Sequence, residues 1–144
     1  MDFQGTHEHT LDAKNRLTIP AVERHKFDEG VVLFQAAERC IEIWTVSGWG
    51  AFVDESLAGR SRLNADTREL SRQFGRRSTR TTLDTAGRVL LSEHQIAYAG
   101  LGRDVTLFGA SECIEVWDRA SADTIDDGKA ETFTELAERL GREG

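Results

Sequence analysis

The sequence has few of the features that mark secreted, membrane-spanning or metal-binding proteins. Its 144 residues include one proline and two cysteines, Cys40 and Cys113. Two distant cysteines make neither a disulfide framework nor a four-ligand zinc site, so we expect both to be small buried residues in a reducing cytoplasm. No apolar run is long enough to span a membrane. The opening residues, MDFQGTHEH, have neither the basic nor the apolar region of a signal peptide, so we expect no secretion.

The motifs of common enzyme classes are also missing. The sequence contains no nucleophile elbow, P-loop or G-x-G-x-x-G motif, so we expect no enzyme, no cofactor and no small-molecule substrate. His7 and His9 would share one face of a strand, but no further ligands are placed beside them, and we expect no metal site. The net charge of −7 argues against nucleic acid as a partner, although a whole-chain sum can hide a local field.

An internal repeat is the strongest positive signal. HTLDAKNRLTIP at 9–20 aligns with TTLDTAGRVLLS at 81–92. LFQAAERCIEIW at 33–44 aligns with LFGASECIEVW at 107–117 if one residue is inserted in the first copy. Two matching blocks in the same order indicate a duplicated structural unit.

Both copies predict the same order of elements, β-turn-β-α-β-β. Pro20 and Ser92 suit helix starts, Pro at the first helical position and Ser as the N-cap, and Gly30 and Gly100 follow the helix ends. The predicted strands are 7–11, 17–19, 31–34 and 40–44 in the first copy, and 81–83, 89–91, 105–108 and 113–117 in the second, with helices at 21–27 and 93–99.

The D-x-x-x-R segments, residues 12–16 and 84–88, are predicted to be tight turns. Asn15 and Gly87 occupy the same position, and these residue types most readily adopt a positive φ. Asp12 and Asp84 can accept the backbone N–H two residues on, which shapes the turn.

One unit alone would expose too many strand edges. We therefore predict a mainly β, α+β fold in which the two units pair into one pseudo-two-fold barrel, with flanking helices.

Helical spacing appears outside the repeats. The predicted organisation is a first repeat at 6–48, a helical Arg-rich connector at 49–77, a second repeat at 78–121 and an acidic helical tail at 122–144. Asn64 is a plausible N-cap within the connector, and Gly128 would limit how far the last helix extends backward. The apolar residues at helical spacing are Trp49, Phe52, Val53 and Leu57, then Leu70 and Phe74, then Phe133, Leu136, Ala137 and Leu140. The tryptophans Trp44, Trp49 and Trp117 are expected to be core or interface anchors.

The positive charge is concentrated in one segment. Residues 60–88 hold eight arginines against three acids, whereas residues 118–144 hold eight acids against four bases. Arg68, Arg72 and Arg76 would form one stripe on a helix, and Arg77 and Arg80 continue the basic segment toward the second turn. Guanidinium groups suit phosphate oxygens and the guanine edge, although an Arg-rich helix can equally be a solvated face.

At D-A-K-N-R-L-T-I-P and D-T-A-G-R-V-L-L-S the chain resembles the MraZ family, whose units belong to the AbrB/SpoVT superfamily. The resemblance extends to Phe3 and Gly5, to the tryptophan-containing strand ends and to the A-E-R-L stretch near the C-terminus. It implies a swapped-hairpin barrel, ring-shaped homo-oligomers and binding of double-stranded DNA at direct repeats. Those repeats would lie upstream of the chain's own division and cell-wall operon, which it would repress as a cytoplasmic, nucleoid-associated regulator.

Carried onto this sequence, the resemblance assigns roles to the two turns. Lys14, Arg16 and Arg88 would read DNA. The charge pattern adds a secondary basic patch formed by Arg68, Arg72, Arg76, Arg77 and Arg80. Asp12, Asn15, Asp84 and Gly87 would shape the turns. The sequence departs from the family at Asn15, where glycine is usual, and at Ala86, which stands where the first turn has Lys14.

Two other interpretations stay open at this stage. Arg16 could simply pair with Asp12 as a surface ion pair that contributes little. The barrel could also be a protein-interaction module, an antitoxin-like or scaffold ring, whose Arg stripe docks an acidic partner or the acidic C-terminal helix of a neighbour. Dependence of binding on DNA sequence separates this interpretation from a regulator.

Overall fold

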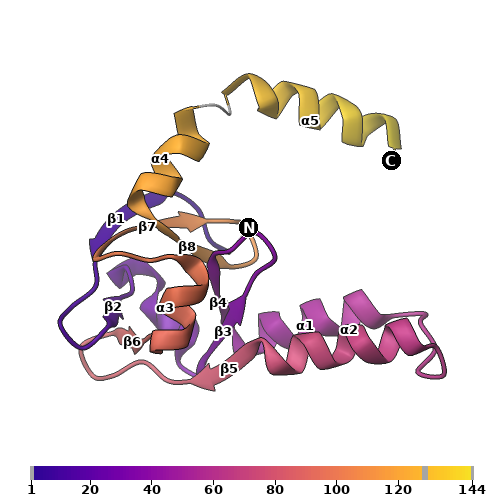
Figure 1. The fold of residues 1–144 in the computed structure, drawn as a ribbon, viewed down its shortest axis with the longest axis horizontal. Helices are drawn as coiled ribbons and strands as arrows, with labels where there is room; N and C mark the ends of the chain where they lie inside the picture. The colour runs from indigo at the N-terminus through magenta and orange to yellow at the C-terminus, as the bar shows by residue number, and fades with distance from the viewer. Residues whose placement is uncertain (1, 128–129, 144) are drawn as a thin grey trace.

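The fold is two antiparallel sheets that enclose the main hydrophobic core. A computed structural model describes residues 2–127 and 130–143 of the chain. A six-stranded sheet has the order β1-β7-β8-β4-β3-β5, and a separate ribbon pairs β2 with β6 (Figure 1). The strands are β1 Thr6–Thr10, β2 Arg16–Thr18, β3 Val31–Gln35, β4 Ile41–Thr45, β5 Ser78–Thr81, β6 Arg88–Leu90, β7 Asp104–Gly109 and β8 Ile114–Asp118.

The two repeats exchange their first strands. β1 of the first repeat pairs with β7 of the second, and β5 of the second pairs with β3 of the first. At the centre of the large sheet β4 pairs with β8, so that Glu42 lies opposite its repeat equivalent, Glu115. In the ribbon Leu17 likewise lies opposite Val89. Both self-pairings lie on a pseudo-two-fold axis, and the predicted interleaved pseudo-dimer is confirmed.

One hydrophobic core lies between the large sheet and the ribbon. Leu17 and Val89 of the ribbon are fully buried there, together with Ile43 and Val116 of the central strands. Because both repeats contribute to this core, neither can bury its apolar face without the other. Cys40 and Cys113 are also buried, as predicted, and burial raises the pKa of both thiols.

Short helices follow the ribbon strands in both repeats. They are η1 Ala21–Phe27, a 3-10 helix, and α3 Glu93–Ala99. Ser92 caps α3 as predicted, because its hydroxyl accepts the Gln95 N–H while the Gln95 side chain accepts the Ser92 N–H. Gly100 ends this helix at a φ of 61°.

Helices α1 Val46–Leu57 and α2 Ala65–Arg76 form a hairpin that projects from the large sheet (Figure 1). Asn64 caps α2, as its spacing predicted. The hairpin is attached by an aromatic cluster, in which Trp49 contacts Phe34 of the sheet at a 4.8 Å centroid distance and Phe74 of α2 at 5.8 Å. Trp44 and Phe52 complete the cluster. Trp44 and Trp49 are therefore packing anchors.

The chain ends in α4 Arg119–Asp127 and α5 Ala130–Glu143, with α5 extending away from the barrel (Figure 1). The expected limit that Gly128 sets on the last helix lies outside the described residues. Within residues 2–127 and 130–143, no helix combines the length and apolar character that crossing a membrane requires.

Three local predictions need correction. The strand predicted at 81–83 is β5, Ser78–Thr81, because the chain must leave its pairing with β3 at Thr81 to reach the turn at Asp84. Pro20 is the N-cap of η1 rather than its first residue, since its ψ of 133° is extended. The strand predicted at 7–11 is β1, Thr6–Thr10, and the backbone N–H of Leu11 instead donates to Arg103 O.

The Glu42–Glu115 pair should make the stability of the fold depend on pH. Burial and the nearby carboxylates of Glu115 and Glu38 raise the pKa of Glu42, against the hydrogen bond from Trp44 Nε1. A raised folded-state pKa stabilises the fold at low pH, and this contribution is lost as pH rises through that pKa. Glu42→Gln should therefore be more stable than wild type at pH 7, by roughly 0.2–1 kcal/mol, and the difference should vanish below about pH 4.

Denaturant melts of both proteins across this pH range measure the difference. Glu8→Gln is the matched control, because Glu8 is an exposed strand residue opposite Thr106. A Glu42→Gln protein less stable than wild type at pH 7 would contradict the interpretation.

Candidate nucleic-acid interface

The first D-x-x-x-R turn is organised by one carboxylate. Asp12 Oδ1 accepts the backbone N–H groups of Lys14 and Arg16, each at 2.9 Å. Asp12 Oδ2 accepts Arg16 Nε at 2.7 Å. Asn15 has a φ of 62°, as the turn prediction required. Asp12 therefore shapes the turn and also holds the Arg16 side chain in one orientation.

The second turn repeats this arrangement. Asp84 Oδ1 accepts the N–H groups of Ala86 at 3.0 Å and Arg88 at 2.9 Å, and Oδ2 accepts Arg88 Nε at 2.8 Å. Gly87 has a φ of 76°. The predicted Asx geometry and positive φ are confirmed in both repeats.

The fold brings the two turns side by side. The ribbon pairs Arg16 with Leu90 and Thr18 with Arg88, and Arg88 Nη1 lies 3.8 Å from Asp12 Oδ2. Two symmetric hydrogen bonds, Ile19 N–H to Gly87 O and Leu91 N–H to Asn15 O, join each turn to the other repeat at 3.0 Å. Lys14 and Arg16 of the first turn thus share one surface with Arg88, which follows Arg16 by 72 residues in the sequence.

Both carboxylates of the turns are ionised at neutral pH. The backbone hydrogen bond from Arg16, the largest cause, lowers the pKa of Asp12 to about 2, with further contributions from the Arg16 side chain and the Lys14 N–H. The backbone hydrogen bond from Arg88 lowers the pKa of Asp84 in the same way. The Arg16–Asp12 ion pair that the alternative interpretation expected is present.

The ion pairs leave donors available. Each arginine uses Nε on its own aspartate, and a guanidinium has five N–H donors in a fixed fork. The Arg16 and Arg88 side chains are 30% and 32% exposed, and Lys14 is exposed. The remaining Nη–H groups can donate to phosphate oxygens or to a guanine edge.

The connector arginines do not join this surface. Figure 1 shows the α1–α2 hairpin projecting on the side of the barrel away from β2 and β6. Glu69 accepts Arg72 Nη1 at 2.8 Å and Arg76 Nη2 at 3.1 Å, so two charges of the stripe are paired. Arg68 donates to Arg62 O, Arg77 donates to Tyr98 Oη, and Arg80 is exposed on β5. The α2 arginines of the predicted patch therefore form a separate basic surface.

Comparison with known families agrees with the repeat. A family model described as "MraZ protein, putative antitoxin-like" matches twice, over residues 3–73 and 76–142. The chain belongs to the MraZ family. The two matches reproduce the duplication seen in the sequence, and the strand exchange described above shows how two MraZ units fold as one body.

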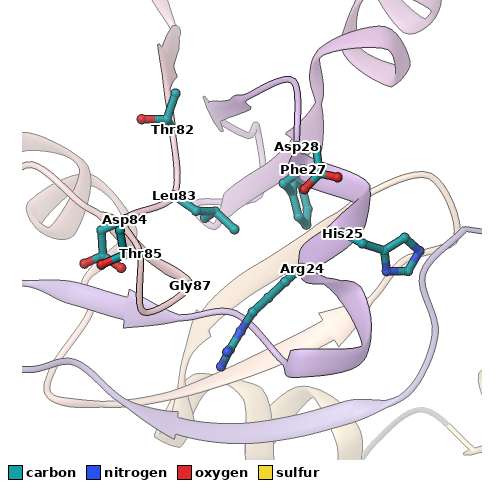
Figure 2. Close-up of a pocket in the computed structure, with 9 residues that line it drawn as sticks. All are labelled: Arg24, His25, Phe27, Asp28, Thr82, Leu83, Asp84, Thr85 and Gly87. Atoms are coloured by element: carbon teal, nitrogen blue, oxygen red, sulfur yellow. The ribbon is translucent and has the colours of Figure 1, made fainter.

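No sequence pattern in this MraZ chain pointed to Arg24 of η1, whose side chain lies against the second turn. Arg24 lies in a cleft of about 310 Å³ between η1 and the second turn and extends toward Gly87 (Figure 2). Its Nε donates to Ile19 O at 2.9 Å. The remaining lining residues are His25, Phe27, Asp28, Thr82, Leu83, Asp84 and Thr85. Only the pairing of the repeats places η1 beside a turn some 60 residues away, so no local pattern marked Arg24.

Gly87→Ala should destabilise this MraZ protein, unlike substitution of a glycine that faces open space. A Cβ at Gly87 would overlap the Nε, Cδ and Cζ atoms of Arg24, and alanine at a φ of 76° adds backbone strain of about 1–2 kcal/mol. Thermal melts measure the cost. In the control Gly50→Ala, the new methyl group meets open space within α1, and we expect stability gained by about 0.4–1 kcal/mol. Equal melting temperatures for the two variants would refute the assigned geometry.

Proposed function

We propose that the chain is a sequence-specific, double-stranded-DNA-binding transcriptional regulator without catalytic activity. The observation that carries this proposal is the pairing of two D-x-x-x-R turns on one surface, each presenting an arginine that an aspartate orients. Orientation by a carboxylate limits the side-chain freedom that binding would otherwise remove, which suits a base-reading arginine. Phosphate contacts would supply most of the affinity and base-edge contacts the specificity.

The regulator would act as a homo-oligomer, a ring, on direct repeats upstream of its own division and cell-wall operon, which it would repress in the cytoplasm at the nucleoid. Support for self-association comes from α5, where Phe133 and Leu140 are 75% and 62% exposed and lie on one helix face. Several turn pairs in one oligomer would multiply a modest affinity through avidity.

The alternative function is an antitoxin-like protein-interaction module. Its support is the separate basic surface on α2 and the wording of the family description. In that case an acidic protein would bind the Arg stripe of residues 68–76, and the turns would be structural.

Fluorescence anisotropy distinguishes the two functions. The purified chain is titrated against DNA from upstream of its own gene and against a scrambled duplex of equal length, at two salt concentrations. The regulator proposal predicts roughly thousandfold tighter binding of the native duplex and a steep fall of log affinity with log salt. Absence of binding to either duplex would favour the interaction module.

A further inference from the structure

Arg24, from the first repeat, lies directly against the turn of the second repeat. Figure 2 shows its side chain extending from η1 toward Gly87, while His25 points away from the turn. The Ile19 backbone connects the two elements, since Ile19 O accepts Arg24 Nε and Ile19 N–H donates to Gly87 O. Gly87 is buried beneath this contact and has no room for a Cβ. Arg24 therefore belongs spatially to the second turn.

The two turns differ in charge, and Arg24 adds a cation to the less positive one. The first turn carries Lys14, and the second has Ala86 at the matching position. The same alignment places Ile96 of α3 at the position of Arg24 in η1, so α3 offers no equivalent cation to the first turn. The first D-x-x-x-R segment thus contains two cations, Lys14 and Arg16, and Arg103 donates to Leu11 O directly before it. The second segment contains only Arg88, and Arg24 is the further cation that lies against it.

The Arg24 guanidinium is less neutralised than those of Arg16 and Arg88. Its Nε is bound to a neutral carbonyl, and across the described residues no carboxylate lies within 4.0 Å and no acceptor is bonded to Nη1 or Nη2. Asp84, which lines the same cleft, is already bonded to two backbone N–H groups and to Arg88 Nε. Two Nη groups beside an open cleft suit the oxygens of a phosphate.

We propose that Arg24 binds a DNA backbone phosphate beside the second turn and there replaces the cation that Lys14 supplies at the first. This inference rests on the proposed DNA-binding function. A phosphate contact fixes the position of the duplex without reading its sequence, so Arg24 contributes to native and scrambled duplexes alike. A purely structural Arg24 would instead support the Gly87 turn and leave counterion release unchanged.

The salt dependence of binding tests the proposal. Affinities of wild type, Arg24→Gln and Arg24→Lys are measured for native and scrambled duplexes between low and moderate salt. Arg24→Gln should reduce the steepness of log affinity against log salt by about 0.9 for each chain in contact with DNA. At 0.1 M salt this corresponds to about eightfold weaker binding, for the native and the scrambled duplex alike. Arg24→Lys should keep the wild-type slope.

Two further variants separate charge from structure. Ala86→Lys in the Arg24→Gln background should restore the slope, because it places a cation where the first turn has Lys14. Arg39→Gln is the control, because it removes one charge from a residue that follows β3, at the end of this strand opposite to η1. It should leave the slope unchanged. If Arg24→Gln melts at a lower temperature, Arg24→Met keeps the aliphatic cover of Gly87 and gives the same comparison.

Each outcome decides one claim. If Arg24→Gln keeps the wild-type slope, the role of Arg24 is overturned and the DNA-binding proposal stands. The same holds if Arg24→Gln binds more weakly with an unchanged slope and Ala86→Lys does not restore the affinity. Failure of the wild-type protein to bind either duplex overturns both.

Discussion

The double variant Arg16→Ala and Arg88→Ala should lose the preference for the native duplex. Each arginine is held by its own aspartate through Nε, which leaves Nη–H groups able to donate, and a bidentate contact to a base edge contributes about 1–3 kcal/mol. The two side chains lie close together, so their effects need not add. Each single variant should weaken specific binding by about 1–3 kcal/mol, and the double variant should bind native and scrambled duplexes about equally.

Anisotropy titrations of both duplexes measure this loss, with oligomeric state checked by light scattering. Arg39→Ala removes an exposed arginine beyond the other end of β3 and should retain the preference. An intact oligomer of the double variant with wild-type affinity for the native duplex would show that these arginines only pair with Asp12 and Asp84.

Leu17→Ala should destabilise the fold by about 2–5 kcal/mol, the usual effect of truncating a buried leucine. Leu17 is fully buried and lies opposite Val89 on the pseudo-two-fold axis, directly after Arg16. Truncation of the Leu17 side chain opens a cavity beneath both turns, because both turns are attached to the ribbon. Thermal and denaturant melts should show the loss, and DNA binding should weaken with it.

Leu90→Ala is the matched control, since Leu90 lies in the same ribbon opposite Arg16 but is 58% exposed. Its effect should stay within about 0.5 kcal/mol. Equal stability of the Leu17→Ala protein and wild type would contradict the placement of the ribbon over the core.

The repeat allowed much of the fold to be predicted. The helix at 93–99, the caps Asn64 and Ser92, and the positive φ of Asn15 and Gly87 all follow from local chemistry, and the structure confirms them. The strand exchange was expected because one unit leaves its edges unpaired. The start of β5 at Ser78 was missed, since its pairing with β3 is a long-range choice that the STRT segment does not reveal.

Only part of the candidate site was predictable from local sequence. The D-x-x-x-R spacing is local, so the roles of Asp12 and Asp84 within the turns could be read from the sequence. Arg24 reaches its turn only through the pairing of the repeats, and the one sequence signal for it was Ala86 standing where the first turn has Lys14. The connector arginines run into the second turn along the chain, yet β5 separates α2 from that turn in space.

Hydrogen–deuterium exchange with and without the native upstream duplex tests the central claim most directly, because it locates the contact on the full-length chain. We predict that DNA slows exchange in peptides covering residues 12–18 and 84–90, which contain both turns and the ribbon, and leaves exchange in α2 unchanged. Tight binding with protection confined to α2, Ala65–Arg76, would contradict it and place the interface on the Arg stripe.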